Sequence, residues 1–186
     1  MENYAEKAPV FRIELPTEGE ELALATMHIQ AWKETYVVPE SGLTNEMVDE
    51  MKGSMLTNTD FRKKIIQEAL SNPENVLYRV VKNENGDIVG FLHGSKQESH
   101  NELEAIYLLN EAKGSGTGSK LMEEFLAWSD KNKYSRLEAF GFNSSAIGFY
   151  EKYGFKKTDT EIEPYKGTLP VIEMVRPAED EFASND

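Results

Sequence analysis

The sequence predicts a mixed α/β fold, a mostly antiparallel central sheet of about six to seven strands flanked by helices. Apolar residues alternate in several short runs, as in strands, and recur at helical spacing in others. The first half carries hairpin signals, above all Asn85-Gly86 between two apolar runs, whereas strands and helices alternate in the second half. A chain of 186 residues is long enough for one domain with a substantial core.

In the first half, the predicted elements begin after a loose leader over residues 1–9. Strands are expected at 10–15, 76–82 and 88–95, and helices from residue 22 to near Pro39, at 43–55 and at 59–70. Thr59 is predicted to cap the last of these helices, because a threonine hydroxyl can accept a hydrogen bond from a free backbone N–H.

In the second half, strands are expected at 102–109, 137–142, 155–163 and 169–176, one helix from the glycine-rich turn to about residue 131, and another at 144–153. The domain is therefore expected to span residues 10–176. Residues 177–186 are acidic and poor in apolar side chains, and we expect this tail to be disordered.

A glycine-rich turn lies between an apolar strand and an amphipathic helix. It reads Lys113-Gly114-Ser115-Gly116-Thr117-Gly118-Ser119. Free backbone N–H groups and the helix dipole at such a helix start favour phosphate. The turn lacks the Gly-Lys-Ser/Thr ending of a nucleotide-triphosphatase loop and the third glycine of a dinucleotide fingerprint. A plain flexible turn is the alternative.

Two segments resemble the signatures of the GNAT family of N-acetyltransferases. The glycine turn is similar to the family's acetyl-CoA loop, Gln/Arg-x-x-Gly-x-Gly/Ala, with Lys113 at the first position. Residues 143–155 are similar to Asn-x-x-Ala-x-x-Phe-Tyr-x-x-x-Gly-Phe. The resemblance covers residues 76–176 and implies the GNAT fold, acetyl-CoA as acetyl donor and no metal. Residues 1–75 match loosely, in the region where family members differ by substrate.

The resemblance also implies which residues hold the donor. Tyr107 and Leu108 correspond to the strand segment that pairs with the pantetheine arm, and a backbone N–H there would stabilise an oxyanion. The remaining positions are Lys113, Gly114, Ser115, Gly116, Thr117, Gly118, Ser119 and Asn143. For Asn143, a helix N-cap is an equally good interpretation.

Three residues are catalytic candidates. Tyr150 matches the family tyrosine that protonates the leaving thiolate, and a phenol is protonated at pH 7. A packed aromatic is the alternative for Tyr150, and Tyr153 is expected to be structural. Glu102 and Glu104 lie two apart on a strand and would share a face. In many relatives a glutamate of this strand acts as base or orders a water that does, but both could simply be solvated.

Composition narrows the function further. The net charge of −13 makes nucleic acid an unfavourable partner and suits a cationic amine, although solubility also explains it. The chain has no cysteine, no long apolar run and no secretory signal, so we expect a cytoplasmic protein without a membrane partner. His28, His93 and His100 lack metal-ligand spacing. The oligomeric state stays open, a homodimer included.

The sequence thus predicts an acetyltransferase that moves acetyl from acetyl-CoA directly to a primary amine, with a small cationic amine such as a polyamine favoured. Trp32 and Tyr36 are expected near the acceptor cleft, where core packing explains Trp32 equally well. The alternative is a catalytically silent, CoA-binding regulatory module that keeps the fold. The departure from the family motif at Lys113, where Gln or Arg is usual, is compatible with such a silent module.

Overall fold

The computed structural model describes residues 9–179 of the chain. The strands are β1 (Arg12–Glu14), β2 (Val76–Lys82), β3 (Ile88–Lys96), β4 (His100–Leu108), β5 (Tyr134–Phe140), β6 (Lys156–Lys157) and β7 (Val171–Arg176). The helices are α1 (Glu21–Tyr36), α2 (Asn45–Lys52), α3 (Ser54–Thr57), α4 (Asp60–Ser71), α5 (Thr117–Trp128) and α6 (Ser144–Glu151), with short 3-10 helices η1 (Pro39–Ser41) and η2 (Asn110–Ala112).

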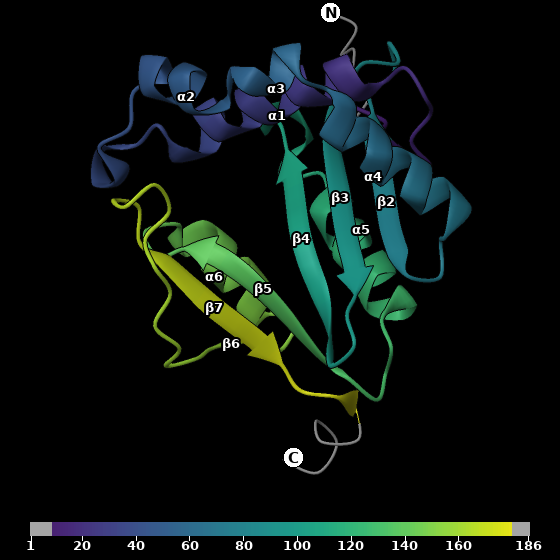
Figure 1. Cartoon of the computed structure of the whole chain (residues 1–186), viewed down its shortest axis with the longest axis vertical. Helices are drawn as coiled ribbons and strands as arrows, with labels where there is room; N and C mark the ends of the chain where they lie inside the picture. The colour runs from purple at the N-terminus through teal and green to yellow at the C-terminus, as the bar shows by residue number, and fades with distance from the viewer. Residues whose placement is uncertain (1–8, 180–186) are drawn as a thin grey trace, which may run out of the picture.

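Within the described residues, the strands form one seven-stranded sheet in the order β1-β2-β3-β4-β5-β7-β6. Every neighbouring pair is antiparallel except β4 and β5. The predicted mixed, mostly antiparallel sheet is therefore confirmed. The helices α1 to α4 lie along one end and the front face of the sheet, while α5 and α6 cover its back (Figure 1).

The parallel pair determines the shape of the sheet. β4 and β5 pair only from His100–Leu103 to Tyr134–Leu137, and beyond that point the strands part (Figure 1). Glu104 is the first residue after the last pair and is the extra residue of a β-bulge against β3, since His93 pairs with Ala105 and Gly94 with Leu103. A bulge bends its strand and increases its twist, which helps β4 diverge from β5.

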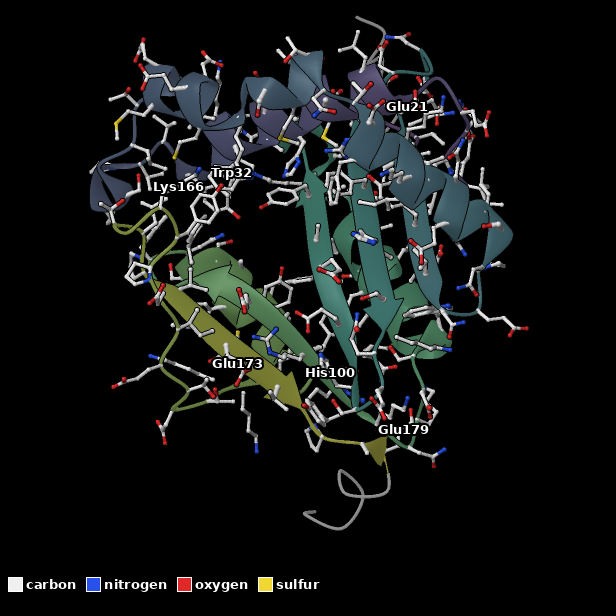
Figure 2. All side chains as sticks on the ribbon, viewed as in Figure 1. Glu21, Trp32, His100, Lys166, Glu173 and Glu179 are labelled. Carbon is white, nitrogen blue, oxygen red and sulfur yellow. The ribbon has the colours of Figure 1, made fainter. Side chains whose placement is uncertain are left out.

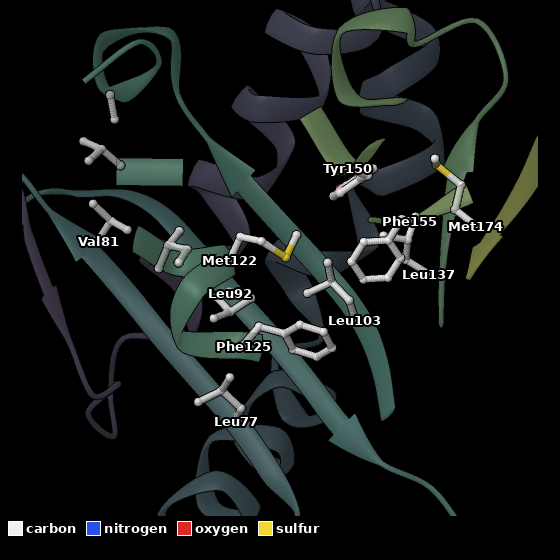
Figure 3. Packing of buried hydrophobic residues seen from close by; sticks show 13 residues of the cluster. Leu77, Val81, Leu92, Leu103, Met122, Phe125, Leu137, Tyr150, Phe155 and Met174 are labelled. Atoms are coloured by element: carbon white, nitrogen blue, oxygen red, sulfur yellow. The ribbon is translucent and has the colours of Figure 1, made fainter. Parts of the chain in front are cut away.

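Two hydrophobic clusters hold the helices on opposite faces. Behind the sheet, Leu121, Met122 and Phe125 of α5 pack with Leu92 and other strand residues (Figure 3). In front, α1 and α4 pack on β2 and β3 through another fully or nearly buried set: Leu24, Met27, Ile66, Ala69, Tyr78 and Phe91. The loops that follow β4 and β5 are thereby held by a rigid scaffold.

Several predicted boundaries are wrong. The helix expected at 43–55 is divided into α2 and α3, with Gly53 between them as the C-cap of the first and the N-cap of the second. The strand expected at 137–142 runs from Tyr134 to Phe140. The helices expected to end at residues 131 and 153 end at 128 and 151.

The strand expected at 155–163 shrinks to Lys156–Lys157. Beyond it, the Thr158 N–H still bonds the Glu173 carbonyl, and the hydroxyls of Thr158 and Thr160 donate to Glu173 Oε1. Thr59 does not cap α4 through its side chain. Its backbone is already helical, and Asn58 Oδ1 accepts the Asp60 N–H instead.

The predicted leader and tail fall mostly outside the described residues. Of the tail, Glu179 is described, and its carboxylate lies 2.6 Å from Lys131 Nζ.

Candidate active site

A cavity of about 620 Å³ opens where β4 and β5 have parted. Four segments that are distant in sequence form its wall, namely the end of α1, the second half of β4, the glycine turn and α6. The lining residues are Glu34, Thr35, Tyr36, Ile106, Tyr107, Leu108, Lys113, Gly114, Gly116, Gly118, Ser119, Asn143, Ser145, Ala146, Phe149 and Tyr150. The structure thus brings both family-like motifs into one site.

The glycine turn shapes one wall of this cavity. Gly114 and Gly116 adopt positive φ angles of 74° and 84°, and Gly116 is the N-cap of α5. Such backbone suits glycine, and no atom lies within 4 Å of a Cβ built at either position. The free N–H groups at the start of α5 therefore border open space, which fits a phosphate of the acetyl donor.

Not every predicted loop residue offers its side chain to a ligand. The Ser115 hydroxyl donates to the Ala112 carbonyl at 2.6 Å and also contacts the hydroxyl of Thr117, which is buried. Neither residue lines the cavity, so Ser115 and Thr117 stabilise the turn from within. Lys113 does line the cavity, but its amine is bonded to Thr35 and Asn110.

Tyr150 lies on α6 with its ring in the core behind the sheet and lines the cavity (Figure 3). Burial raises the pKa of its phenol above the ordinary value, so the hydroxyl stays protonated at neutral pH. Asn143 caps α6 by accepting the Ala146 N–H, as one of its two interpretations predicted, and lines the cavity as well. Tyr153 packs beside Phe149 and is absent from the lining, consistent with a structural role.

Two further phenols lie close to Tyr150. The hydroxyls of Tyr36 and Tyr107 are 3.2 Å apart. Burial raises the pKa of both, and the charge interaction with Tyr150 adds to the effect at Tyr36. This end of the cavity therefore carries three neutral hydroxyl groups. The sequence placed Tyr36 only near an acceptor cleft, because its contact with β4 joins residues 71 positions apart.

The backbone of β4 adds a donor. The Leu109 N–H bonds the Val89 carbonyl, and N–H groups alternate in direction along an antiparallel strand. The N–H of Leu108 therefore points away from β3, toward the side where β5 has departed. Of the two predicted residues, Leu108 rather than Tyr107 has the N–H suited to stabilise an oxyanion.

The two candidate bases line a second hollow, of about 360 Å³, beside the paired part of β4 and β5. Glu102 is buried and engaged, with oxygens 2.9 Å from Arg136 Nη1 and 3.1 Å from His100 Nε2. Burial raises its pKa. Glu104 is exposed and accepts a hydrogen bond from Ser95 Oγ at 2.7 Å. Neither glutamate lines the cavity that holds Tyr150.

A third group of side chains closes the open end of the gap between β4 and β5. The sequence analysis expected two of its members, Trp32 and Tyr36, near the acceptor cleft and missed the other three. Trp32 and Tyr36 of α1 stack edge-on against Phe140 of β5, with ring centroids 5.5 and 4.8 Å apart. Lys52 of α2 and Tyr165 of the loop before β7 join them, and we call these five residues the aromatic wall. Aromatics scattered over α1, β5 and a loop have no spacing that could reveal such a cluster.

The comparisons with known proteins identify the family. Residues 43–155 match the family model described as acetyltransferase (GNAT) family, which is more than half of the chain. The chain therefore belongs to the GNAT family and is an acetyl-CoA-dependent N-acetyltransferase. No curated protein matches it.

Solved structures share the fold at low sequence identity. The PaiA N-acetyltransferase of Thermoplasma acidophilum, solved in complex with coenzyme A, superposes with a TM-score of 0.73 at 21% identity, covering 90% of this chain and 99% of that one. A ribosomal-protein-alanine N-acetyltransferase from Brucella melitensis gives 0.65 at 19% identity, covering 89% and 99%. Ard1 from Thermoplasma volcanium gives 0.55 at 23%, covering 92% and 99%. These similarities establish the fold.

Two searches of the described residues bear on other classes of function. Across residues 9–179, no helix is both long and apolar enough to cross a membrane. In the same part of the chain, no group of three or more histidine, aspartate or glutamate side chains is arranged to hold a metal ion.

Proposed function

We propose that this acetyltransferase transfers acetyl directly to a primary amine, with Tyr150 as general acid and Glu104 ordering the water that takes up the amine's proton. One observation carries the proposal: the Tyr150 hydroxyl, the Leu108 edge of β4 and the glycine turn line the same cavity. A phosphate-binding turn, an oxyanion donor and a proton donor are what acyl transfer from a thioester requires.

The chemistry balances with the residues present. The amine nitrogen forms a bond to the thioester carbonyl carbon, and the carbon–sulfur bond breaks. The ammonium loses one proton to water held by Glu104 before attack, and the departing thiolate receives the Tyr150 proton. The nitrogen loses a second proton as the amide forms, and this proton returns to Tyr150 through water, so that the phenol is protonated again. Burial of Tyr150, which raises its pKa, keeps that proton available over the working pH range. The chain has no cysteine nucleophile, which is consistent with direct attack.

Glu104 suits the base role better than Glu102. Glu102 is held by Arg136 and His100, so its charge is already compensated. Glu104 is exposed at the residue where β4 leaves β5, where an amine entering from the front of the sheet would meet a water-accessible carboxylate. Because it lies outside the cavity, a water molecule must connect it to the amine.

The preference for a small cationic amine such as a polyamine rests on the net charge of −13 and on Glu104. The aromatic wall carries Lys52, whose positive charge opposes that preference. The catalytically silent module is disfavoured, because Tyr150 keeps its cavity position and Lys113 serves a structural bond to α1.

A thiol-release assay tests the proposal. Acetyl-CoA is combined with polyamines, lysine-like amines, aminoglycosides, amino acids and peptides, and free thiol is measured with time. Amine-dependent release is expected for at least one class, with acetylated amine confirmed by mass spectrometry. Tight acetyl-CoA binding with no release for any amine would favour the silent module instead.

A further inference from the structure

Lys52 occupies an unusual environment in the aromatic wall. Its ammonium lies 3.7 Å from the centroid of the Trp32 ring and 4.9 Å from that of Tyr165, and it donates a hydrogen bond of 2.9 Å to the Tyr165 hydroxyl. Among the described residues, no carboxylate oxygen lies within 4.0 Å of this amine. Partial burial, together with the nearby charge of Lys166, lowers the pKa of Lys52 to about 8.

Lys166 supplies a second positive charge at the same place (Figure 2). It follows Tyr165 in the loop before β7, and its φ of 53° makes it the one non-glycine residue with positive φ in the described part of the chain. Such backbone costs about 1 kcal/mol or more for a residue with a side chain. The strained turn therefore holds a lysine near another lysine, with no carboxylate paired to it among residues 9–179.

The closeness of Lys52 and Lys166 is unusual for this protein, in which several other lysines are paired with carboxylates. The chain has 33 acidic and 20 basic residues, so carboxylates are abundant. Lys82, which is also largely covered, shows the usual solution, because its amine lies 2.7 Å from Glu20 and 3.3 Å from Glu14, and these contacts raise its pKa. Two uncompensated cations at one place are unfavourable unless an anion joins them.

We propose that Lys52, Lys166 and the Tyr165 hydroxyl form a subsite for an anionic group, a carboxylate in the first instance, carried by the acceptor amine. Tyr165 accepts its bond from Lys52, so its own proton is free to be donated onward. Lys52 retains N–H donors beyond the one given to Tyr165. Together these groups offer three donors and two positive charges to one ligand.

The subsite lies beside the reaction centre. Tyr165 is close enough to raise the pKa of Tyr107, whose hydroxyl contacts Tyr36 in the cavity wall. Trp32, beneath the Lys52 amine, stacks against Tyr36. An acceptor held by its anion at Lys52 would therefore present an amine toward the cavity that contains Tyr150.

This inference rests on the proposed function and changes its substrate class. An acceptor bound in this way is zwitterionic: its amine reacts near Tyr150 while a carboxylate contacts Lys52 and Lys166. Amino acids and peptides with a nearby C-terminus have this chemistry. A purely cationic polyamine would place like charge against the aromatic wall.

Matched acceptors test the subsite. Initial rates are measured with L-lysine against L-lysinamide and with β-alanine against β-alaninamide, pairs that differ in one carboxylate. We expect the wild type to favour the carboxylate by about tenfold or more in kcat/KM, as for hydrogen bonds to charged groups. In Lys52→Met, the ratio of carboxylate to amide rates should fall at least tenfold. Lys166→Ser should reduce it less, because Lys166 is exposed.

Lys64→Met is the matched control, since Lys64 is exposed on α4 and loses the same charge. It should keep the wild-type ratio. Equal ratios in wild type and Lys52→Met would overturn the subsite, and so would a preference for the amides. A larger dissociation constant for CoA in Lys52→Met would also overturn it, because the lysine would then belong to the CoA site.

Calorimetric titration separates this proposal from the proposed function. The same four compounds, with inorganic phosphate as a free-anion probe, are added to the protein saturated with CoA, where no transfer occurs. Carboxylate-selective binding that disappears in Lys52→Met supports the subsite even if no amine is acetylated. Binding of phosphate alone, without discrimination between acid and amide, would reduce the site to an unspecific anion contact and overturn the proposal.

Discussion

The gap between β4 and β5 has two sides, the proposed acetyl-CoA side at the glycine turn (the donor side) and the proposed amine side at the aromatic wall (the acceptor side). They are built from different kinds of groups. On the proposed donor side, the glycine turn, the start of α5 and α6 all come from residues 113–151, and backbone N–H groups are the proposed phosphate contacts. On the acceptor side, single side chains from α1, α2, β5 and the loop before β7 meet in the aromatic wall. The first is local in sequence and the second is not.

This difference bears on specificity. A site made of backbone N–H groups recognises phosphate in almost any sequence that keeps the turn, whereas a wall of side chains can be changed one residue at a time. The acceptor can therefore differ among proteins with the same fold while the donor stays the same. The predictions below test how far each side follows this division.

Replacement of Tyr150 should have the largest effect. Tyr150→Phe keeps the ring in the core and removes the proton donor, so kcat should fall about 10²- to 10⁴-fold, the usual contribution of general acid catalysis. Single-turnover kinetics with saturating acetyl-CoA measures the chemical step directly. Tyr153→Phe is the matched control, because Tyr153 is absent from the cavity lining. Equal rates for the two variants would exclude Tyr150 as the acid.

Glu104 should come next, with a loss of about 100-fold for Glu104→Gln near neutral pH. The deficit should shrink as pH rises and more of the amine loses its proton without help. Glu102→Gln should affect the rate less, since Arg136 and His100 already engage this carboxylate. A pH–rate profile of both variants checks the assignment, and a larger loss in Glu102→Gln would reverse the roles.

A charge in the glycine turn should weaken donor binding by about 10- to 100-fold. Gly116→Glu puts a carboxylate beside the N–H groups of α5, where it competes with phosphate. Gly116→Asn separates charge from backbone strain, since asparagine tolerates positive φ. Calorimetry with acetyl-CoA measures both. Affinity near wild type for the folded glutamate variant would contradict a phosphate site at this turn.

The sequence predicted secondary structure well where its signals are local. The alternation in Val76–Lys82 and the turn at Asn85-Gly86 predicted their elements correctly. Prediction failed beyond β6, where the hydroxyls of Thr158 and Thr160 bond the distant Glu173 carboxylate, and at Gly53, where the expected helix is divided in two. The contact with Glu173 leaves no periodic trace in the sequence.

The same reasoning applies within the site. Tyr150 and the glycine turn could be predicted from motif context, but the roles of Ser115 and Thr117 depend on hydrogen bonds within the folded turn. The bulge at Glu104 and the engagement of Glu102 by Arg136 require the register of β3, β4 and β5. Lys52 lies outside both motifs, and only its neighbours Trp32 and Tyr165 distinguish it.

The smallest expected effect concerns stability, and it tests whether the aromatic wall holds a cation at a cost to folding. The pKa of Lys52 is about 8 in the folded protein and about 10.4 in an unfolded chain, so charged Lys52 destabilises the fold. That cost is fully present below pH 8 and fades toward pH 10.4, because the unfolded chain then binds more protons than the folded one. Lys52→Met removes the cost at every pH.

The free energy of unfolding of the wild type, relative to Lys52→Met, should therefore rise by about 1 kcal/mol between pH 7.5 and about 10, after allowance for the partial exposure of the amine. Urea titrations of both proteins at matched ionic strength measure this difference, and Lys64→Met controls for the loss of a surface charge. Adding β-alanine at neutral pH should reduce the same difference, because an anion at the subsite would compensate the two lysines. If the difference in unfolding free energy between wild type and Lys52→Met does not change with pH, the pKa of Lys52 is not lowered by folding. The aromatic wall would then hold no destabilising cation, and the two sides of the site would not differ in this respect.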